Sequence, residues 1–398
     1  MNLEFKILES FEVTAEKILS NLTGKKVRIT KCDRLTEDGR RNLLLRCFIE
    51  PIDDLPKSFI IKKVEGSYDL NNAKSWDTKR FFNDWIGSQF LNNLETEFQH
   101  SPRFYGGDRN LGLIVIEDVK HCQRLVEPLL GSDRVLAERS LLQYSTCLAQ
   151  LHGDTLGKAE EFSRMMRTVL LNFEPIKTSV NIDKHQQRLS DLGIECGNDW
   201  REDLEAIHQT VNQPEDFLAY IHADACPDNV LDTGEKLRLI DFETGHFGHA
   251  FLDATFCRMM FPTCWCSKKI PDDVIRKVED TYRKTLISYF PLLENDEIYE
   301  RNLISVCGFW LLYTLQRHFD DALEKEEDFG ISTIRQRILA RLESFIAISK
   351  ECDRLTGLRD TSSLLLDLLS KRWSNVPSLP VYPAFISSKA LKSTSLSV

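Results

Sequence analysis

The sequence predicts an α+β protein with two lobes, an N-terminal lobe built on an antiparallel sheet and a larger helical C-terminal lobe. Short β-rich runs separated by turn residues occupy residues 25–65, whereas helical periodicity dominates from residue 133 onward. The predicted lobes are residues 1–120 and 121–374, and a cleft between lobes is a common place for a ligand. Residues 375–398 are rich in proline and serine, so we expect a flexible tail there.

The N-terminal lobe begins with a predicted helix at residues 3–22, where apolar residues recur at helical spacing. Three β-rich runs follow, separated by the turn sequences TEDGRR and PIDDLPK, and they predict strands joined by hairpins. A helix, a turn and a buried strand that ends in acids complete the lobe. The strands are expected at 26–32, 42–50, 58–65 and 111–119, the helix at 78–97 and the turn, RFYGGDRN, at 103–110.

The C-terminal lobe is predicted to be mostly helical. Leucines of residues 133–152 form one stripe, as in a helix that packs against a core. The sequence is strand-like only around residues 228–242, where TGEK at 233–236 predicts a hairpin turn. Further helices are expected at 156–173, 199–212, 271–290, 296–324, 331–352 and 361–373.

The composition is that of an ordinary globular protein. Of the 398 residues, 42% are hydrophobic and 28% charged. The net charge of −10 argues against a nucleic-acid-binding surface, which would be basic. We expect no membrane contact either, because the longest apolar run, residues 306–315, is too short to span a bilayer. The sequence does not indicate an oligomeric state.

The 11 cysteines are odd in number and scattered along the chain. The N-terminus has no apolar segment of the kind found in secretory signals. We therefore expect reduced thiols in a cytoplasmic protein. Cys264 and Cys266 form a C-W-C pair that is compatible with zinc, but without a second close pair ordinary thiols are favoured.

The polar residues of YIHADACPDNVL, residues 220–231, lie between apolar ends. Asp224 and Asn229 offer a carboxylate and an amide five residues apart, and Asp241 follows the predicted hairpin. That hairpin would bring Asn229 and Asp241 to the same end of its ladder. Mg²⁺ prefers such hard oxygen ligands together with phosphates and water. The pattern therefore predicts a magnesium site suited to phosphoryl transfer from a nucleotide.

The sequence H-x-D-x-x-x-x-N, followed by a hydrophobic strand and D-F-E, resembles the catalytic core of aminoglycoside phosphotransferases and their choline kinase-like relatives. The resemblance implies a bilobal protein-kinase-like fold and an enzyme that uses ATP and Mg²⁺ to phosphorylate a hydroxyl of a small molecule. It also implies that Asp224 is the catalytic base, that Asn229 and Asp241 bind Mg²⁺, that His222 supports the loop by hydrogen bonding, and that Asp253 is structural.

SFIIKKVE, residues 58–65, resembles the family's strand that carries a phosphate-binding lysine. Lys62 is favoured because strand alternation then places Ile60 against adenine, and Lys63 is the alternative. The acid that pairs with this lysine would be Asp84, where the family usually has Glu.

Glu95 and Glu97 are alternatives to Asp84 later in the same predicted helix. LIVIEDV, residues 113–119, resembles the hinge strand, whose Glu117 to Val119 would meet adenine mainly through backbone groups. The resemblance covers roughly residues 25–260 and includes no glycine-rich loop. Because the later helices cannot be matched, the acceptor is not predicted.

A dinuclear metallohydrolase is a rival interpretation of the same polar residues. Its ligands would come from His222, Asp224, Asp241, His246, His249 and Asp253. The spacing of Asn229, the lysine strand and the hinge-like strand favour the kinase. A nucleotide-binding pseudokinase and a protein kinase are further alternatives. The sequence lacks A-P-E and an obvious activation loop, which favours a small-molecule acceptor.

Overall fold

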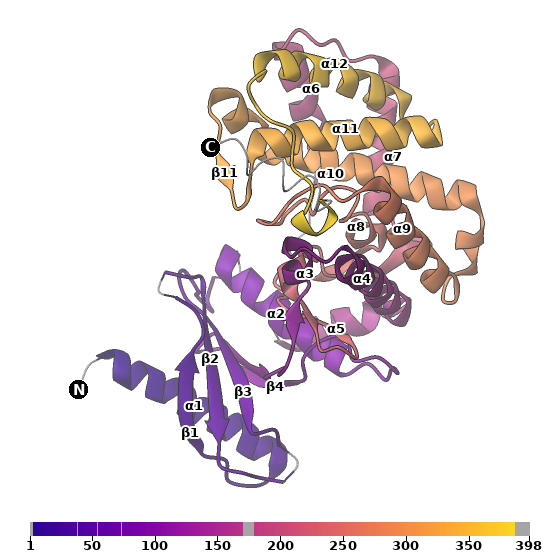
Figure 1. The fold of residues 1–398 in the computed structure, drawn as a ribbon. Helices are drawn as coiled ribbons and strands as arrows, with labels where there is room; N and C mark the ends of the chain where they lie inside the picture. The colour runs from indigo at the N-terminus through magenta and orange to yellow at the C-terminus, as the bar shows by residue number, and fades with distance from the viewer. Residues whose placement is uncertain (1–2, 38, 54, 73, 170–178, 387–398) are drawn as a thin grey trace. The chain divides into compact units, whose positions relative to one another are not determined.

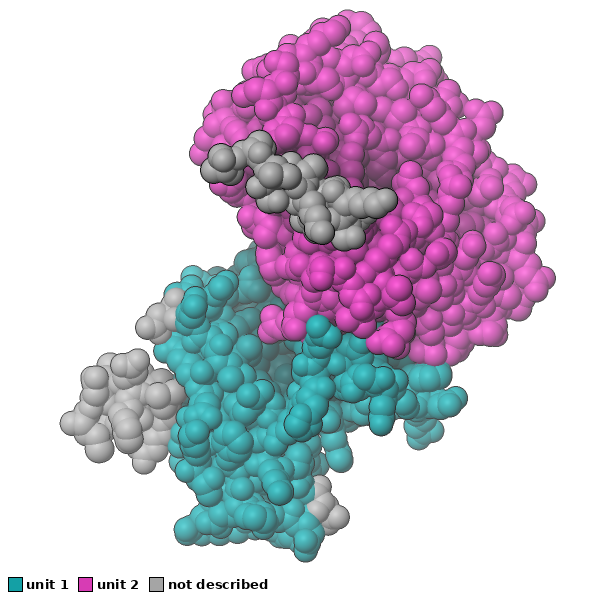
Figure 2. Space-filling model, viewed as in Figure 1, with its two compact units in different colours: residues 1–123, 160–177, 231–246 teal, residues 124–159, 178–230, 247–398 magenta. Residues whose placement is uncertain are grey.

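The structure is a computed structural model that describes residues 3–37, 39–53, 55–72, 74–169 and 179–386. The chain divides into two compact units, which Figure 2 colours separately. The first comprises residues 1–123, 160–177 and 231–246, and the second comprises residues 124–159, 178–230 and 247–398.

The predicted single boundary after residue 120 is therefore incomplete, because two later segments return to the first unit. Helix α5 (Ala159–Val169) packs there through Phe162, whose ring centroid lies 5.3 Å from that of Phe90. Strand β9 (Leu237–Leu239) is held by the Leu239 N–H, which donates to His100 O at 2.8 Å. Asp241, predicted in the helical lobe, thus belongs to the first unit.

The first unit contains a five-stranded antiparallel sheet in the order β1-β2-β3-β5-β4, of which Figure 1 labels β1, β2, β3 and β4. Helix α1 (Leu3–Thr23) packs on one face of the sheet through Phe11 and Leu19. Alternation places Ile61 on the α1 face and therefore turns Lys62 to the opposite face. The strands are β1 (Ile29–Arg34), β2 (Asn42–Ile49), β3 (Ser58–Val64), β4 (Phe104–Asp108) and β5 (Leu113–Glu117).

The three predicted β-rich runs are confirmed as β1 to β3, but the predicted turn RFYGGDRN is wrong, because its residues form β4. Tyr105 is buried in the sheet core, and the pairing of β4 with β5 is irregular between Phe104 and Gly106. A Cβ at Gly107 would lie 2.6 Å from the ring of Trp85, so glycine here permits close packing. The predicted helix 78–97 is α2 (Trp76–Asn92).

Helices build the second unit, as predicted. The longest, α10 (Asp296–Glu324), runs through its core with Phe309, Trp310 and Leu311 buried. A Cβ on Gly308 would lie 2.7 Å from Ile207 Cδ1, so this glycine lets α7 approach α10 closely. The other helices are α3 (Val126–Leu130), α4 (Arg134–Thr155), α6 (Ile182–Asp191), α7 (Asn198–Asn212), α8 (Phe251–Ala254), α9 (Asp272–Ile287), α11 (Ile334–Cys352) and α12 (Thr356–Arg372).

Short strands and turns complete the fold. The predicted hairpin turn is confirmed, since the Thr233 N–H donates to Lys236 O at 3.1 Å. None of the described helices is both long and apolar enough to cross a membrane. The remaining strands are β6 (Gln123–Arg124), β7 (Leu218–Ile221), β8 (Val230–Asp232), β10 (His246–His249), β11 (Asp328–Phe329) and β12 (Ser332–Thr333), and short 3₁₀ turns cover Glu215–Phe217, Pro227–Asn229, Pro291–Glu294 and Pro383–Phe385.

The predicted flexible tail is wrong for its first part. Tyr382 is fully buried, and its hydroxyl donates to Cys266 O at 2.6 Å. Its N–H donates to Lys269 O at 3.0 Å, and the Lys269 N–H donates to Pro380 O at 2.9 Å. Leu379 and Phe385 are buried as well, so a few apolar residues hold a segment whose overall composition is polar. Residues 387–398 lie outside the described residues.

Candidate active site

Lys62 lies at the centre of a cluster of carboxylates in the first unit. It projects from β3, is 9% exposed, and has its Nζ 2.7 Å from Oδ2 of Asp84 on α2. The same Nζ donates to Asp241 Oδ1 and lies 3.2 Å from Glu243 Oε1. Strand β3, helix α2 and the D-F-E segment therefore meet at one ammonium group.

This crowding perturbs the titration of the cluster. Burial alone would lower the pKa of Lys62, but Asp241, Asp84 and Glu243 raise it well above its ordinary value. Burial, with the nearby negative charges of Glu243 and Asp84, raises the pKa of Asp241 to about 6, against the effect of Lys62. At neutral pH the lysine is therefore charged, and Asp241 and Glu243 are mostly ionised.

Asp84 is the acid that the sequence predicts as the partner of Lys62. Its Oδ2 meets Lys62, and its Oδ1 accepts the N–H of Phe242 at 2.9 Å. Asp84 therefore joins the lysine strand to the backbone that follows Asp241. Glu95 and Glu97, the alternatives, lie beyond the end of α2 at Asn92. The other candidate lysine is directed elsewhere, because Lys63 Nζ donates to Val64 O and lies 5.5 Å from the Phe11 ring on the α1 face.

Glu243 is a residue of this cluster that sequence reasoning missed. It is 3% exposed, pairs with Arg80 at 2.5 Å and with Arg41 at 2.5 Å, and accepts a bond from Asn42 Nδ2. Burial would raise the pKa of Glu243, but Lys62 and the two arginines hold it below its usual range. Its place two residues after Asp241, as the E of D-F-E, was the available signal.

The predicted hinge lies at the end of β5. Ile60 pairs with Ile116 in the sheet and shares the face of Lys62. The Glu117 N–H donates to Arg103 O at 2.8 Å, and Val119 O accepts a bond from the Cys122 thiol at 3.2 Å.

Asp118, between the two predicted hinge residues, was not singled out in the sequence. It is 6% exposed and ion-pairs with Arg46 Nε at 3.0 Å. Its Oδ2 also accepts the hydroxyl of Ser58 at 2.6 Å. The side chain of Asp118 thus fixes the backbone that follows β5 to β2 and β3.

The loop at 222–229 belongs to the second unit and is supported by Asp253. The N–H groups of His222 and Ala223 donate to the two oxygens of Asp253, at 2.6 and 2.9 Å. His152 Nε2 lies 3.3 Å from the same carboxylate and, because a carboxylate only accepts, is the donor. Burial would raise the pKa of Asp253, but the His152 bond and the His222 contacts lower it. His222 and Asp253 are fully buried.

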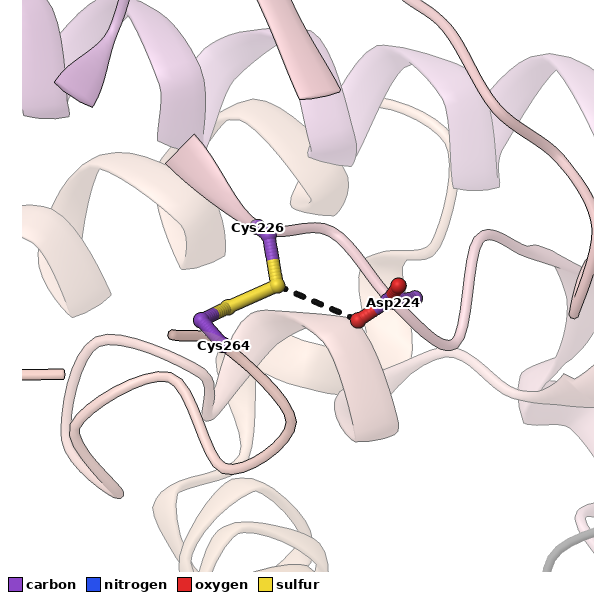
Figure 3. Close-up of side chains that lie close together, drawn as sticks. All are labelled: Asp224, Cys226 and Cys264. Atoms are coloured by element: carbon purple, nitrogen blue, oxygen red, sulfur yellow. Dashed lines mark hydrogen bonds between the residues drawn. A yellow bond between two sulfur atoms is a disulfide. The ribbon is translucent and has the colours of Figure 1, made fainter. Parts of the chain in front are cut away.

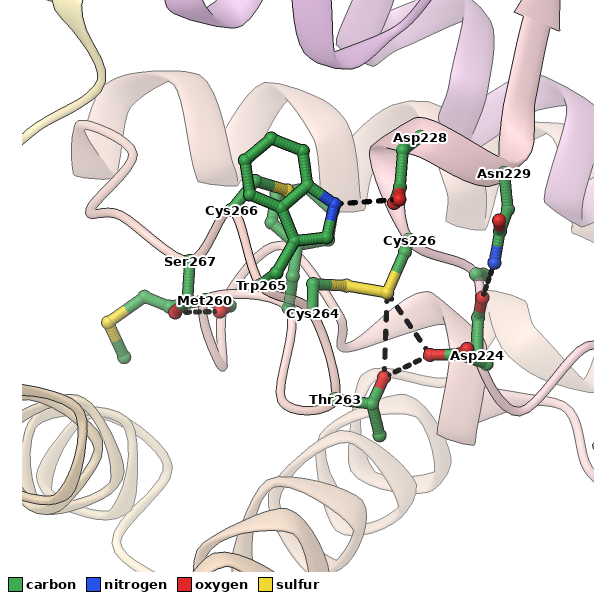
Figure 4. Close-up of a disulfide and its surroundings, with 12 residues drawn as sticks. Asp224, Cys226, Asp228, Asn229, Met260, Thr263, Cys264, Trp265, Cys266 and Ser267 are labelled. Carbon is green, nitrogen blue, oxygen red and sulfur yellow. Dashed lines mark hydrogen bonds between the residues drawn. A yellow bond between two sulfur atoms is a disulfide. The ribbon is translucent and has the colours of Figure 1, made fainter. Parts of the chain in front are cut away.

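Asp224 and Asn229 lie within this loop (Figure 4). Asn229 Nδ2 donates to Asp224 O at 3.0 Å, which leaves the amide oxygen of Asn229 as the atom suited to a cation. Tyr144 OH donates to Ala225 O at 2.7 Å, and Thr263 Oγ1 donates to Asp224 Oδ1 at 2.5 Å. Asn229 and Asp241 belong to different units, so their joint metal site stays a prediction.

Two disulfides overturn the prediction that all thiols are reduced. Cys32 bonds to Cys47 across β1 and β2, and Cys226 bonds to Cys264. Cys264 is therefore not available as one half of a C-W-C zinc pair. The pairings join residues 15 and 38 positions apart, and nothing in the sequence connects them. The cysteines outside these two disulfides are Cys122, Cys147, Cys196, Cys257, Cys266, Cys307 and Cys352.

Within each unit, the described residues do not gather the histidines and carboxylates predicted for a metallohydrolase. The clusters of three potential ligands there are Asp84 with Asp241 and Glu243, and Asp224 with Cys226 and Cys264, and neither contains a histidine. His246 Nδ1 instead meets Thr244 O at 2.8 Å, and His249 Nε2 meets Asn302 Oδ1 at 2.9 Å.

No family model matches the sequence, and no curated protein matches it. Among solved structures, the chain is similar to a choline/ethanolamine kinase family protein from Mesorhizobium loti, with 15% identity over 88% of this chain and 99% of that one and a TM-score of 0.42. It is also similar to choline kinase from Cryptosporidium parvum, with 13% identity over 85% of this chain and 93% of that one and a TM-score of 0.45. A third similar structure is a macrolide 2′-phosphotransferase from Brachybacterium faecium, with 12% identity over 79% of this chain and 94% of that one and a TM-score of 0.43. Such low identities do not transfer an activity to this chain.

Proposed function

We propose that this chain is a phosphotransferase that uses ATP and Mg²⁺ to phosphorylate a hydroxyl group of a small molecule. The main supporting observation is the buried Lys62 of the sheet, paired with Asp84 of α2 and with Asp241 of the D-F-E segment. Phosphoryl transfer depends on positioning and on neutralising phosphate charge, which requires a fixed cation beside metal-binding carboxylates. Three carboxylates hold the ammonium group of Lys62 in place, which supports that role.

The donor chemistry of the chain fits a hard divalent cation. Asp241 offers a carboxylate whose side chain is 31% exposed, and Asn229 offers an amide oxygen. We propose these two residues as the protein ligands of Mg²⁺. A bound Mg²⁺ would neutralise negative charge on the phosphates during transfer. Lys62 would add a second positive charge, while Ile60 and the backbone from Glu117 to Val119 would contact adenine.

Asp224 is proposed to accept the proton of the attacking hydroxyl. Thr263 and the disulfide lie on the side of its Oδ1 oxygen. His222 acts indirectly, because its N–H anchors the loop to Asp253. A positioned base of this kind contributes roughly 10²–10⁴-fold to a rate.

We propose a cytoplasmic location and a small acceptor, with no binding to nucleic acid or membrane. The net charge of −10 supports the absence of a nucleic-acid partner. Disulfides are rare in a reducing compartment, so a cytoplasmic location implies that the two found here form reversibly.

The test is transfer of labelled γ-phosphate from ATP to a panel of amino alcohols, aminoglycosides, sugars and hydroxylated amino acids. We expect Mg²⁺-dependent product with at least one class. Both Asp241→Ala and Asp224→Asn should lower turnover by about 10²-fold or more while the fold survives. Asp232→Asn, in the neighbouring hairpin, is the matched control and should retain activity. Near-normal turnover by the Asp241→Ala protein would show that the metal assignment is wrong.

A further inference from the structure

The Cys226–Cys264 disulfide lies beside the carboxylate proposed as the base (Figure 3). Cys226 follows Asp224 by two residues, and Cys264 directly follows Thr263 in the segment between α8 and α9. The two Cα atoms are 5.6 Å apart, and both side chains are buried. The bond therefore joins the loop of Asp224 to a segment 38 residues later in the sequence.

The joined segment contacts one oxygen of Asp224. Thr263 Oγ1 donates to Asp224 Oδ1 at 2.5 Å, and Cys226 Sγ lies 3.1 Å from the same oxygen. Because both contacts fall on Oδ1, they orient the carboxylate and direct Oδ2 away from the sulfur (Figure 3). A general base requires an oxygen held in a fixed direction toward its proton donor.

The backbone around Thr263 is anchored independently of the sulfur bond. Arg337, which is 1% exposed, donates to Cys264 O at 2.6 Å and to Trp265 O at 3.0 Å. Tyr382 donates to Cys266 O at 2.6 Å. On the other side, the loop of Asp224 is anchored to Asp253. The disulfide thus joins two supported pieces of backbone, and it sets the separation between them.

Breaking the bond alters this site in two ways. Two sulfur atoms that are no longer bonded move apart to van der Waals contact, a shift of more than about 1 Å, whereas an O–H···O bond such as that between Thr263 and Asp224 is lost when it lengthens by about that much. Cys226 also gains a weak S–H donor near Asp224 Oδ1, whereas the disulfide sulfur has no proton to donate. The strong hydroxyl donor is weakened, and a poorer donor is added on the same oxygen.

We propose that Thr263 is a positioning residue for Asp224 and that the Cys226–Cys264 disulfide holds it in place, so that the oxidation state of this pair sets the orientation of the base. This inference rests on the proposed function for the role of Asp224. Oxidation removes two S–H protons and two electrons from the cysteines and forms one S–S bond. A glutathione-type disulfide accepts both and is released as two thiols, by exchange through a mixed disulfide.

The first experiment compares full-length protein oxidised by glutathione disulfide with protein reduced by a phosphine, using the acceptor found by the screen. The state of each cysteine pair is read by alkylation and mass spectrometry. We expect reduction to lower kcat about tenfold, with the KM for nucleotide changed less than about twofold, because the base and not the nucleotide site is disturbed. Oxidised Thr263→Val should show the same loss, and Thr263→Ser should recover most of it.

The second cysteine pair is the matched control. The double variant Cys32→Ser/Cys47→Ser lacks the disulfide of the first unit and should keep the full response to reduction. The variant Cys226→Ser/Cys264→Ser should have low kcat under both conditions. Equal kcat in both states, with the Cys226–Cys264 pair verified as reduced, would overturn the proposal, and so would normal kcat in Thr263→Val.

A measurement without turnover separates this inference from the proposed function. If the disulfide favours the contact between Thr263 and Asp224, removing the contact must make the disulfide easier to reduce. In a glutathione titration, Thr263→Val should shift the equilibrium of Cys226–Cys264 toward thiols severalfold and leave Cys32–Cys47 unchanged. This shift without transfer to any acceptor would contradict only the proposed function. Transfer without the shift would contradict only the present inference.

Discussion

Asp241 and Ala223, the residue before Asp224, have left-handed backbone conformations. Their φ angles are 71° and 58°. Such a conformation costs a residue with a Cβ roughly 1–2 kcal/mol, and it persists only where surrounding bonds impose it. Here the Phe242 N–H is bonded to Asp84 and the Ala223 N–H to Asp253. The two carboxylates proposed to act in catalysis are therefore presented by strained backbone that buried acids hold in place.

The two adjacent lysines of β3, Lys62 and Lys63, give a prediction about single residues. Lys62→Met should lower kcat/KM by about 10²-fold or more, because a fixed positive charge beside the phosphates is lost. Lys63→Met should stay within about threefold, since its ammonium lies on the α1 face of the sheet. Steady-state kinetics with the identified acceptor measures both. Equal losses in the two variants would contradict the assignment.

The roles of single residues were partly predictable. Period-two alternation favoured Lys62 over Lys63 on the face of Ile60, and the structure places both lysines accordingly. The partners of Glu243 were not predictable, because Arg41 and Arg80 come from distant hairpin and helix positions. Thr263 carries no sequence signal at all, since its role depends on a contact made 39 residues from Asp224.

Among the elements, the loop at 222–229 depends most on a single buried side chain. We expect Asp253→Asn to lower the free energy of unfolding by about 2–4 kcal/mol, because an amide cannot replace a carboxylate that accepts three bonds in a buried site. It should also lower kcat, since the loop carries Asp224. Thermal unfolding and kinetics measure the two effects. The exposed Asp280→Asn on α9 is the control, and equal behaviour of the two variants would contradict this account.

Helices with strong hydrophobic periodicity were predictable from the sequence. The elements that were not predicted share a cause. Helices α7, α9 and α10 begin and end within about three residues of their predicted bounds. Strand β4 was missed because glycines 106 and 107 indicated a turn, and α6 because only His185 and Leu189 of its ten residues are buried. In each case tertiary packing stabilises a segment that has little local preference.

At the scale of the whole molecule, the order of elements along the chain does not give the composition of the two units. The sequence predicted one boundary, whereas residues 160–177 and 231–246 return to the first unit. Polar side chains hold the second of these segments in the first unit. Asp84 accepts the N–H of Phe242, and Glu243 forms ion pairs with Arg41 and Arg80. Hydrophobic periodicity carries no information about such contacts.

The buried histidines of the second unit predict how the stability of the molecule depends on pH. Burial lowers the pKa of His185 and of His249 to about 4. Because their pKa is near 6.5 when unfolded, the unfolded chain binds more protons between pH 4 and 6.5, and stability falls as pH falls through that window. For fully buried His249 this loss is about 2 kcal/mol between pH 7.5 and 5.

His249→Gln removes one of these titrating groups and retains a polar side chain that can bond to Asn302. Its unfolding temperature should therefore decline less than that of the wild type between pH 7.5 and 5, even if it is lower at pH 7.5. The exposed His208→Gln on α7 should follow the wild-type decline. The wild type and His249→Gln should be compared by far-UV circular dichroism, because helices build most of the second unit. An identical decline in the two proteins would show that His249 does not contribute to the acid sensitivity.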